Sequence, residues 1–221
     1  MSAPLPARSP LVGVFGGTFD PVHYGHLRSA LELVERLQLE QLRLMPSAQP
    51  PHREAPQCSA AHRAAMVELA VAGEPRLVCD ARELQRSGKS YTIDSLIELR
   101  SELGADTGLC MVLGCDAVLD VSRWHRWQEL LDWAHIVVLA RPGWELPRTG
   151  PVAQWLNAHR LDDVRTLRRQ SAGSIVIEEL RPLAISSTEV RALLTAGRSA
   201  RYLIPQSVLD YIQTHQLYRQ K

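Results

Sequence analysis

Short apolar runs alternate with longer amphipathic segments along the whole chain. Runs of consecutive apolar residues are typical of strands buried on both faces of a sheet, and they predict strands at 11–15, 41–45, 76–79, 109–113, 136–140 and 174–177. Apolar positions with helical spacing predict helices at 22–37, 60–72, 92–103, 117–121, 127–133, 152–158, 187–196 and 205–215. This alternation predicts an α/β fold with a parallel sheet and helices on both of its faces.

The first ten residues differ in composition from the rest of the chain. Residues 1–10 contain three prolines and no apolar core, which is unlike a signal peptide and typical of a flexible tail. We therefore expect such a tail, followed by a single domain over 11–221. Because no run of 18 or more apolar residues occurs, no membrane span is expected.

Charge and cysteine content narrow the function classes. Lys and Arg number 25 against 24 Asp and Glu, so the formal net charge of +1 gives no general reason to expect nucleic acid or a membrane surface as a partner. The four cysteines form no Cys-x-x-Cys and no zinc-type spacing with histidine. We expect free thiols, with Cys79 and Cys110 buried in strands, and a cytoplasmic protein.

The first predicted strand leads directly into residues 16–26, Gly-Gly-Thr-Phe-Asp-Pro-Val-His-Tyr-Gly-His. A strand, a glycine turn and a helix start together form a phosphate cradle, and a doubly wound, Rossmann-like sheet binds its ligands at the carboxyl ends of its strands. Asp20 as N-cap and Pro21 at the first helical position would place His23 and His26 on one face, with both rings toward the helix N-terminus.

Each part of this segment can also be explained without a bound phosphate. Two glycines after a strand are common, and His-x-x-His can be half of a metal site, although no third ligand lies nearby in the sequence. The segment is neither the dinucleotide fingerprint Gly-x-Gly-x-x-Gly nor a Walker A loop, because no Gly-Lys-Ser/Thr follows.

As a whole, the segment resembles the signature of the nucleotidyltransferase superfamily with a (T/H)xGH motif, and it is most similar to that of the bacterial nicotinate-nucleotide adenylyltransferases. In that superfamily the histidine pair binds the phosphates of ATP in the transition state, a role that the resemblance implies for His23 and His26. The loop residues that it places around the phosphates are Gly16, Gly17, Thr18 and Phe19.

Residues 185–191, Ile-Ser-Ser-Thr-Glu-Val-Arg, form a second candidate anion site. Ser186 followed three positions later by Glu189 has the form of a capping box, which by itself indicates only a capped helix. The stretch resembles the family's Ile-Ser-Ser-Thr-x-x-Arg motif, whose helix start and arginine bind the β- and γ-phosphates of ATP. The resemblance extends this role to Ile185, Ser187, Thr188 and Arg191.

Several residues between these motifs resemble the substrate side of the family. Gly114-Cys115-Asp116 follows a strand, where an acid accepts hydrogen bonds from a ligand or caps the next helix. The resemblance implies nucleotide contacts for Gly114 and Asp116, and it implies that Trp124 stacks on the nicotinate ring with a cation–π contribution. His125 stands where relatives often carry tyrosine, and Trp127 fits core packing.

Three further positions complete the expected site. Thr92 is a candidate helix cap, and the family binds the nicotinate carboxylate through backbone amides around this segment. Arg53 stands in Pro-Pro-His-Arg, which resembles the family's Pro-Pro-His-Lys with the cation kept and its geometry changed. Arg141 lies in Arg-Pro-Gly, which resembles a loop near the adenine.

The resemblance implies adenylyl transfer from ATP to the 5′-phosphate of nicotinate mononucleotide, giving deamido-NAD and pyrophosphate. Mg²⁺ would accompany ATP, and no protein metal site is expected. Alternatives are the same chemistry on nicotinamide mononucleotide or phosphopantetheine, and a catalytically silent nucleotide sensor. A dinucleotide-dependent oxidoreductase is disfavoured because its glycine fingerprint is absent. The oligomeric state is left open.

Overall fold

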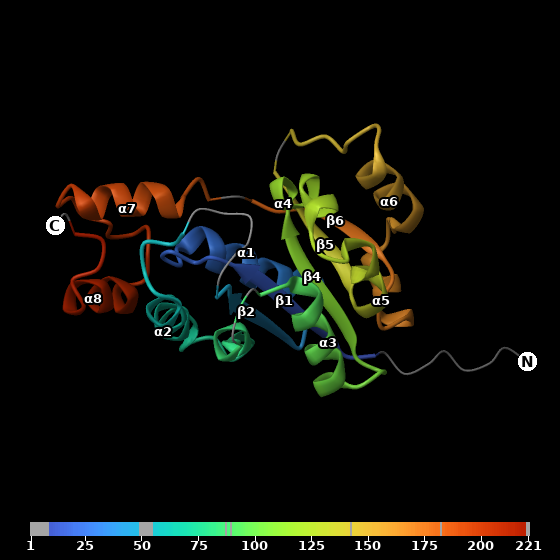
Figure 1. Ribbon diagram of the computed structural model, residues 1–221, viewed down its shortest axis with the longest axis horizontal. Helices are drawn as coiled ribbons and strands as arrows, with labels where there is room; N and C mark the ends of the chain where they lie inside the picture. Colours follow the sequence, from blue (N-terminus) through green and yellow to red (C-terminus); the bar gives the residue numbers. More distant parts are fainter. Residues whose placement is uncertain are drawn as a thin grey trace, which may run out of the picture. The chain divides into compact units, whose positions relative to one another are not determined.

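The computed structural model describes residues 9–48, 55–86, 88, 90–141, 143–181 and 183–219. In this part of the chain six strands form one sheet with the order β3-β2-β1-β4-β5-β6 (Figure 1). The pairs β2–β3, β4–β5 and β5–β6 are parallel. The strands are β1 (Leu11–Gly17), β2 (Gln41–Pro46), β3 (Leu77–Cys79), β4 (Gly108–Gly114), β5 (His135–Ala140) and β6 (Ile175–Glu179). The predicted α/β fold of the doubly wound kind is confirmed.

Each predicted helical region contains helix, although several bounds differ. The α-helices are α1 (Tyr24–Arg36), α2 (Ala60–Val71), α3 (Thr92–Leu103), α4 (Cys115–Leu119), α5 (Leu130–Trp133), α6 (Pro151–His159), α7 (Ser187–Thr195) and α8 (Gln206–Thr214). Short 3₁₀ turns are η1 (Arg82–Gln85), η2 (Val121–Arg123), η3 (Trp127–Glu129) and η4 (Val164–Arg169). The predicted helices at 117–121 and 127–133 are wrong in detail, because each is divided between an α-helix and a 3₁₀ turn. No helix of the described residues is long and apolar enough to cross a bilayer.

The chain divides into two compact units, which are described separately. One comprises Met1–Val14, Val34–Gln41 and Tyr91–Leu180, and the other comprises Phe15–Leu33, Leu42–Ser90 and Arg181–Lys221. The expectation of a single domain over 11–221 stays a prediction. Residues 1–8 of the expected tail lie outside the described part of the chain.

The first unit is built on the ladder of β4, β5 and β6. Cys110 of β4 pairs with His135 of β5, and Ile136 pairs with Ile175 of β6. The uninterrupted apolar runs of β4 and β5 are buried, as expected for strands covered on both faces. The burial of His135 is tolerated because both of its ring nitrogens are hydrogen-bonded. Nδ1 accepts from the Ser174 amide, so Nε2 carries the proton and donates to the Gln170 carbonyl.

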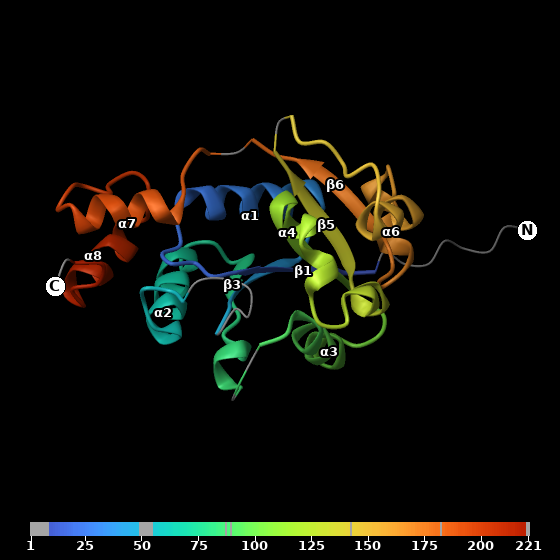
Figure 2. The same cartoon turned by 45° about the horizontal axis from the view of Figure 1, so that its top comes forward.

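In the second unit α2 packs against α8, and α7 lies beside them (Figure 2). Ser59 caps α2 by accepting from the His62 amide. The apolar residues Met66 and Val67 of α2 and Val208 and Leu209 of α8 are buried. This packing explains why the helical spacing of both segments was visible in the sequence.

All four cysteines are free thiols, as expected. Cys110 is buried as predicted, whereas Cys79 is only half-buried because β3 is a short strand at the end of the sheet order. Burial raises the pKa of each of these two thiols to about 12, so both stay protonated at neutral pH.

Arg100 ties the end of α3 to three other segments of the first unit. Its guanidinium donates to the backbone carbonyls of Gly104, Thr107, Trp133 and Ser171 at 2.5–3.0 Å. One charged side chain thus donates to four backbone acceptors and links the segments that carry them.

We expect Arg100→Met to lower the free energy of unfolding by about 2–3 kcal/mol, since the carbonyls lose a charged partner while the apolar stem is kept. Urea unfolding followed by circular dichroism would measure the change. Arg165→Met is the matched control, because Arg165 is exposed and pairs only with Asp163 among the interactions described. Equal unfolding midpoints for wild type and Arg100→Met would contradict this account.

Candidate active site

The two histidines of segment 16–26 lie in parallel at the start of α1. The rings of His23 and His26 stack with centroids 3.7 Å apart and an interplanar angle of 25°. The carbonyl of His23 accepts from the amides of His26 and Leu27, which starts the helix. A Cβ at Gly25 would lie 2.9 Å from the His23 ring, so this stacking requires glycine at that position.

The hydrogen bonds of His26 determine its tautomer. Its Nδ1 accepts from the backbone amide of His23 at 3.3 Å, and an acceptor nitrogen carries no proton. The proton of the neutral ring is therefore on Nε2, which is left as a donor. The ring also meets Phe19 edge-on, with centroids 5.0 Å apart.

Both histidines are neutral at physiological pH. Burial lowers the pKa of His23 to about 4, and burial together with the neighbouring His23 lowers the pKa of His26 to about 3. Nδ1 of His23 is buried without a hydrogen-bond partner in the described part of the protein. The pair thus offers hydrogen-bonding nitrogens without a permanent positive charge.

The expected helix start at Asp20-Pro21 is wrong. The helix begins at Tyr24, and Asp20 is buried with 4% of its surface exposed. Its carboxylate accepts from the Gln57 amide at 2.9 Å and from the Tyr218 hydroxyl at 2.6 Å, so it does not cap the helix. Long-range partners have taken the place of the local cap.

The expected glycine turn is also corrected in detail, because β1 continues through both glycines. The carbonyl of Gly17 accepts from the Ser47 amide, which extends the strand pairing. A Cβ at Gly17 would lie 2.8 Å from the ring of Phe19, so glycine is needed for that close packing. A Cβ at Gly16 would have no atom within 4 Å, so the backbone there is open to a ligand.

Arg63 supports this loop from α2, and no sequence motif indicated it. Its side chain is 1% exposed and donates to the carbonyls of Thr18 at 2.7 Å, Ala48 at 3.2 Å and Cys58 at 3.4 Å. An arginine in an amphipathic helix is ordinarily a surface residue, which is why its role could not be found in the sequence.

The start of α7 belongs to the same unit and contacts the loop directly. Ser187 donates from its hydroxyl to the Pro21 carbonyl at 2.9 Å, and Arg191 donates to the Asp20 carbonyl at 2.7 Å. The Ile185 carbonyl lies 3.4 Å from where a Cβ of Gly25 would be. Segments 16–26 and 185–191, far apart in the sequence, thus meet.

The cap predicted for α7 is confirmed, because the Ser186 hydroxyl accepts from the Glu189 amide at 3.1 Å. Arg191 also donates to the Thr188 hydroxyl at 3.3 Å. Its Nε is buried and has no hydrogen-bond partner among the described residues.

Apart from Arg53, the residues predicted for the substrate side lie in the other unit. Thr92 is the first residue of α3 and not its cap, because Tyr91 holds the cap position without a side-chain hydrogen bond. The ring of Tyr91 lies 4.5 Å from that of His125, centroid to centroid. Trp124 is half-buried just after η2, and Trp127 meets Trp155 edge-on, in agreement with its packing role.

Two of the predicted substrate residues are bound to each other. Asp116 and Arg141 form an ion pair at 3.1 Å, and both side chains are largely exposed. Gly114 ends β4 and is the N-cap residue of α4, so the alternative that Asp116 caps this helix is wrong, because Asp116 lies in its first turn. Arg53 lies outside the described residues.

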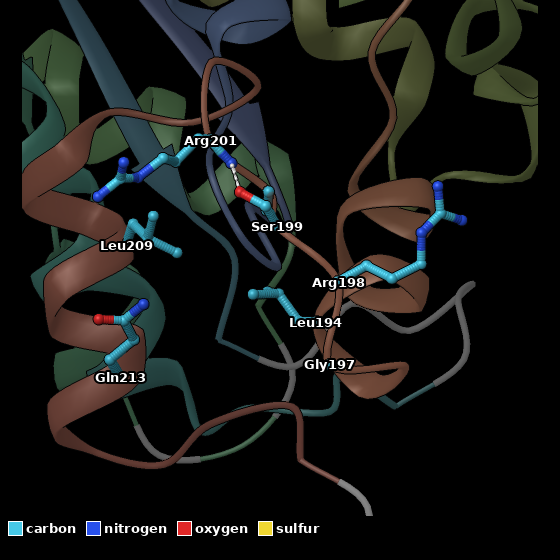
Figure 3. A pocket seen from close by; sticks show the side chains of 8 residues that line it. Leu194, Gly197, Arg198, Ser199, Arg201, Leu209 and Gln213 are labelled. Carbon is cyan, nitrogen blue, oxygen red and sulfur yellow. Dashed lines mark hydrogen bonds between the residues drawn. The ribbon is translucent and has the colours of Figure 1, made fainter.

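A cavity of about 240 Å³ lies between α7 and α8 (Figure 3). In it Arg198 extends away from Leu209, and the Ser199 hydroxyl accepts from the Arg201 amide. Residues predicted for the site do not line it. The full lining is Leu194, Gly197, Arg198, Ser199, Ala200, Arg201, Leu209 and Gln213.

The chain is similar to known proteins over nearly its whole length. Residues 14–193 match the model of the cytidylyltransferase-like family. A Pseudomonas aeruginosa protein named "Probable nicotinate-nucleotide adenylyltransferase" is 53% identical over 94% of this chain and 97% of its own. A Cellvibrio japonicus protein of the same name is 52% identical over 95% and 99%.

The fold agrees with that of a solved enzyme of low sequence identity. The nicotinic acid mononucleotide adenylyltransferase of Plasmodium falciparum, complexed with NaAD, matches with a TM-score of 0.70 at 17% identity, covering 95% of this chain and 97% of that one. The chain therefore belongs to the cytidylyltransferase-like family, among relatives named as nicotinate-nucleotide adenylyltransferases.

Proposed function

We propose that this protein transfers the adenylyl group of ATP to the 5′-phosphate of nicotinate mononucleotide, forming deamido-NAD and pyrophosphate in NAD biosynthesis. The observation that carries the proposal is the neutral histidine pair, with Nε2 of His26 as a donor, beside the start of α7 with Arg191. The names of relatives at about 50% identity support the same activity.

The reaction needs positioning more than acid–base chemistry. The phosphate of a mononucleotide has a second pKa of about 6, so it is already an anionic nucleophile at neutral pH. Its oxygen bonds to the α-phosphorus as the bond from that phosphorus to the β-phosphate oxygen breaks, and pyrophosphate leaves. Donors aimed at the transferring and departing oxygens lower the barrier.

The candidate site residues of the second unit then have the following roles. His26 donates from Nε2 to an α-phosphate oxygen, and His23 offers a second ring nitrogen. Thr188 supplies its hydroxyl and Ser187 its backbone amide to the departing pyrophosphate, because the Ser187 hydroxyl already donates to the Pro21 carbonyl. Arg191 supplies positive charge. The remaining contacts would come from Gly16, Gly17, Thr18, Phe19 and Ile185.

In the other unit, the start of α3 at Thr92 would receive the nicotinate carboxylate. Charged hydrogen bonds to backbone amides favour a carboxylate over the neutral amide of nicotinamide mononucleotide. Trp124 would stack on the pyridine ring, whose positive charge adds a cation–π term. Nucleotide contacts are proposed for Gly114, Asp116 and Arg141 of this unit, and also for Arg53, which lies outside the described residues.

We treat Mg²⁺ as part of the ATP substrate, where it neutralises phosphate charge. In the described part of the chain no group of three His, Cys, Asp or Glu side chains could hold a metal ion. No step of the reaction is assigned to protein ligands of the ion.

The activity is tested by pyrophosphate release from ATP and Mg²⁺ with three acceptors offered separately. We expect fast release with nicotinate mononucleotide and much slower release with nicotinamide mononucleotide or phosphopantetheine. Faster release with nicotinamide mononucleotide would retain the chemistry and overturn the role given to the start of α3. Tight binding of ATP without release on any acceptor would instead indicate a nucleotide sensor.

We expect His26→Ala to lower kcat by on the order of 100-fold or more, as for the loss of one preorganised donor at a developing charge. His26→Gln keeps an N–H donor on a side chain of similar reach and should recover part of the loss. The exposed His159 provides the control, since His159→Ala should leave kcat unchanged. Full activity of His26→Ala would exclude a role at the α-phosphate.

The lowered pKa values of the two histidines also predict how the stability of the fold depends on pH. The folded pKa values of about 4 and about 3 lie below the unfolded value of about 6.5, so the unfolded chain binds more protons at acidic pH. Both histidines therefore favour the folded state fully above pH 6.5, and stability is lost as the pH falls toward their folded pKa values.

NMR titration of the ring resonances, assigned with His23→Asn and His26→Asn, should show no midpoint between pH 5 and 8 for either residue. Free histidine in the same tube serves as the reference. A midpoint near 6.5 would show a pair that becomes cationic in mild acid and would contradict the neutral-donor account.

A further inference from the structure

The buried phenol of Tyr218 has no part in the chemistry proposed above, yet it reaches the phosphate loop. Tyr218 lies beyond the end of α8 and is 7% exposed. Its hydroxyl donates to Oδ1 of Asp20 at 2.6 Å, across 198 positions of sequence. Burial and the Asp20 carboxylate raise the pKa of the phenol, so it keeps its proton and stays a donor.

The other atoms of Asp20 are held by two further segments. Oδ2 accepts from the Gln57 amide at 2.9 Å and lies 3.9 Å from the Arg191 guanidinium, which also donates to the Asp20 carbonyl at 2.7 Å. Asp20, which lies between the glycines and the histidines, is thus held by the segment before α2, by α7 and by the segment after α8. Each hydrogen bond restricts its position further.

Tyr218 also closes a ring of interactions through α7. The Thr195 hydroxyl donates to the Tyr218 carbonyl at 3.1 Å. Thr195 and Arg191 are four residues apart on α7 and therefore share a face. The ring runs from Asp20 to Arg191, along α7 to Thr195, then to Tyr218 and back to Asp20. The residue proposed to hold pyrophosphate and the loop that leads to His23 therefore share one support.

The backbone conformation at residues 217 and 218 supports this contact. The Leu217 amide donates to the Ile212 carbonyl, and Tyr218 has φ of 59°, a left-handed conformation that is uncommon for residues other than glycine. Such a conformation persists where surrounding contacts maintain it, and the two hydrogen bonds of Tyr218 to Asp20 and Thr195 do so.

We propose that Tyr218 is a positioning residue of the phosphate site: acting through Asp20, it sets the positions of His23, His26 and Arg191 for adenylyl transfer. The inference rests on the proposed function for its catalytic consequence, but its geometric part does not. A residue that only anchors the end of the chain would alter stability without altering the site.

The experiment compares Tyr218→Phe with Tyr211→Phe. Both variants remove one hydrogen-bonded hydroxyl from the same end of the chain, but the Tyr211 hydroxyl bonds to His62 Nδ1 at 3.0 Å and not to Asp20. We expect Tyr218→Phe to lower kcat by about 10-fold or more, as for a small displacement of catalytic groups. Tyr211→Phe should keep the wild-type kcat, and both should lose similar amounts of thermal stability.

A double-mutant comparison tests the route through Asp20. In an Asp20→Asn background, Tyr218→Phe should lower kcat much less than in wild type, because the partner of the hydroxyl is already altered. A full additional loss in that background would show that Tyr218 acts elsewhere and would overturn the proposal.

The ring resonances of His23 and His26 give a readout that does not depend on turnover. We expect Tyr218→Phe to shift them and Tyr211→Phe to leave them in place. If wild type fails to release pyrophosphate with any acceptor, the proposed function fails while these shifts still decide the geometric claim. Unshifted resonances in Tyr218→Phe, or a kcat loss equal to that of Tyr211→Phe, would reduce Tyr218 to an anchor.

Discussion

The buried carboxylate of Asp20 is the constraint on which the candidate site depends. A carboxylate withdrawn from water is costly unless its oxygens are hydrogen-bonded, and here the partners are the Tyr218 hydroxyl, the Gln57 amide and, at longer range, Arg191. Satisfying this one group therefore obliges three segments to converge. That convergence places the start of α7 against the loop that carries the histidines.

Two arginines determine how the loop is held. Arg63 on α2 donates to the Thr18 carbonyl, and Arg191 on α7 donates to the Asp20 carbonyl. Because each guanidinium has several donors in a rigid plane, it can hold more than one acceptor at once. Arg191 donates both to the Asp20 carbonyl and to the Thr188 hydroxyl, so it joins the loop to the start of α7. Under the proposed function, the same side chain would also supply positive charge to pyrophosphate.

The histidine pair shows how burial selects a chemical role. Desolvation by the protein keeps both rings neutral, and the bond from the His23 amide to Nδ1 leaves His26 with its proton on Nε2. A neutral donor stabilises charge as it develops without binding ground-state phosphate as strongly as a cation would, which favours the transition state. Gly25 permits the stacking that maintains this state.

The sequence alone determined the element order, because strands buried on both faces and amphipathic helices leave distinct periods. It also located the Ser186 cap, since capping depends on neighbours three residues away, and it singled out the two segments that are proposed to bind phosphate. It misplaced the start of α1 and missed Arg63 and Tyr218. Only the tertiary structure decided these, because the partners of Asp20 lie up to 198 positions away and a local pattern contains no trace of a long-range hydrogen bond.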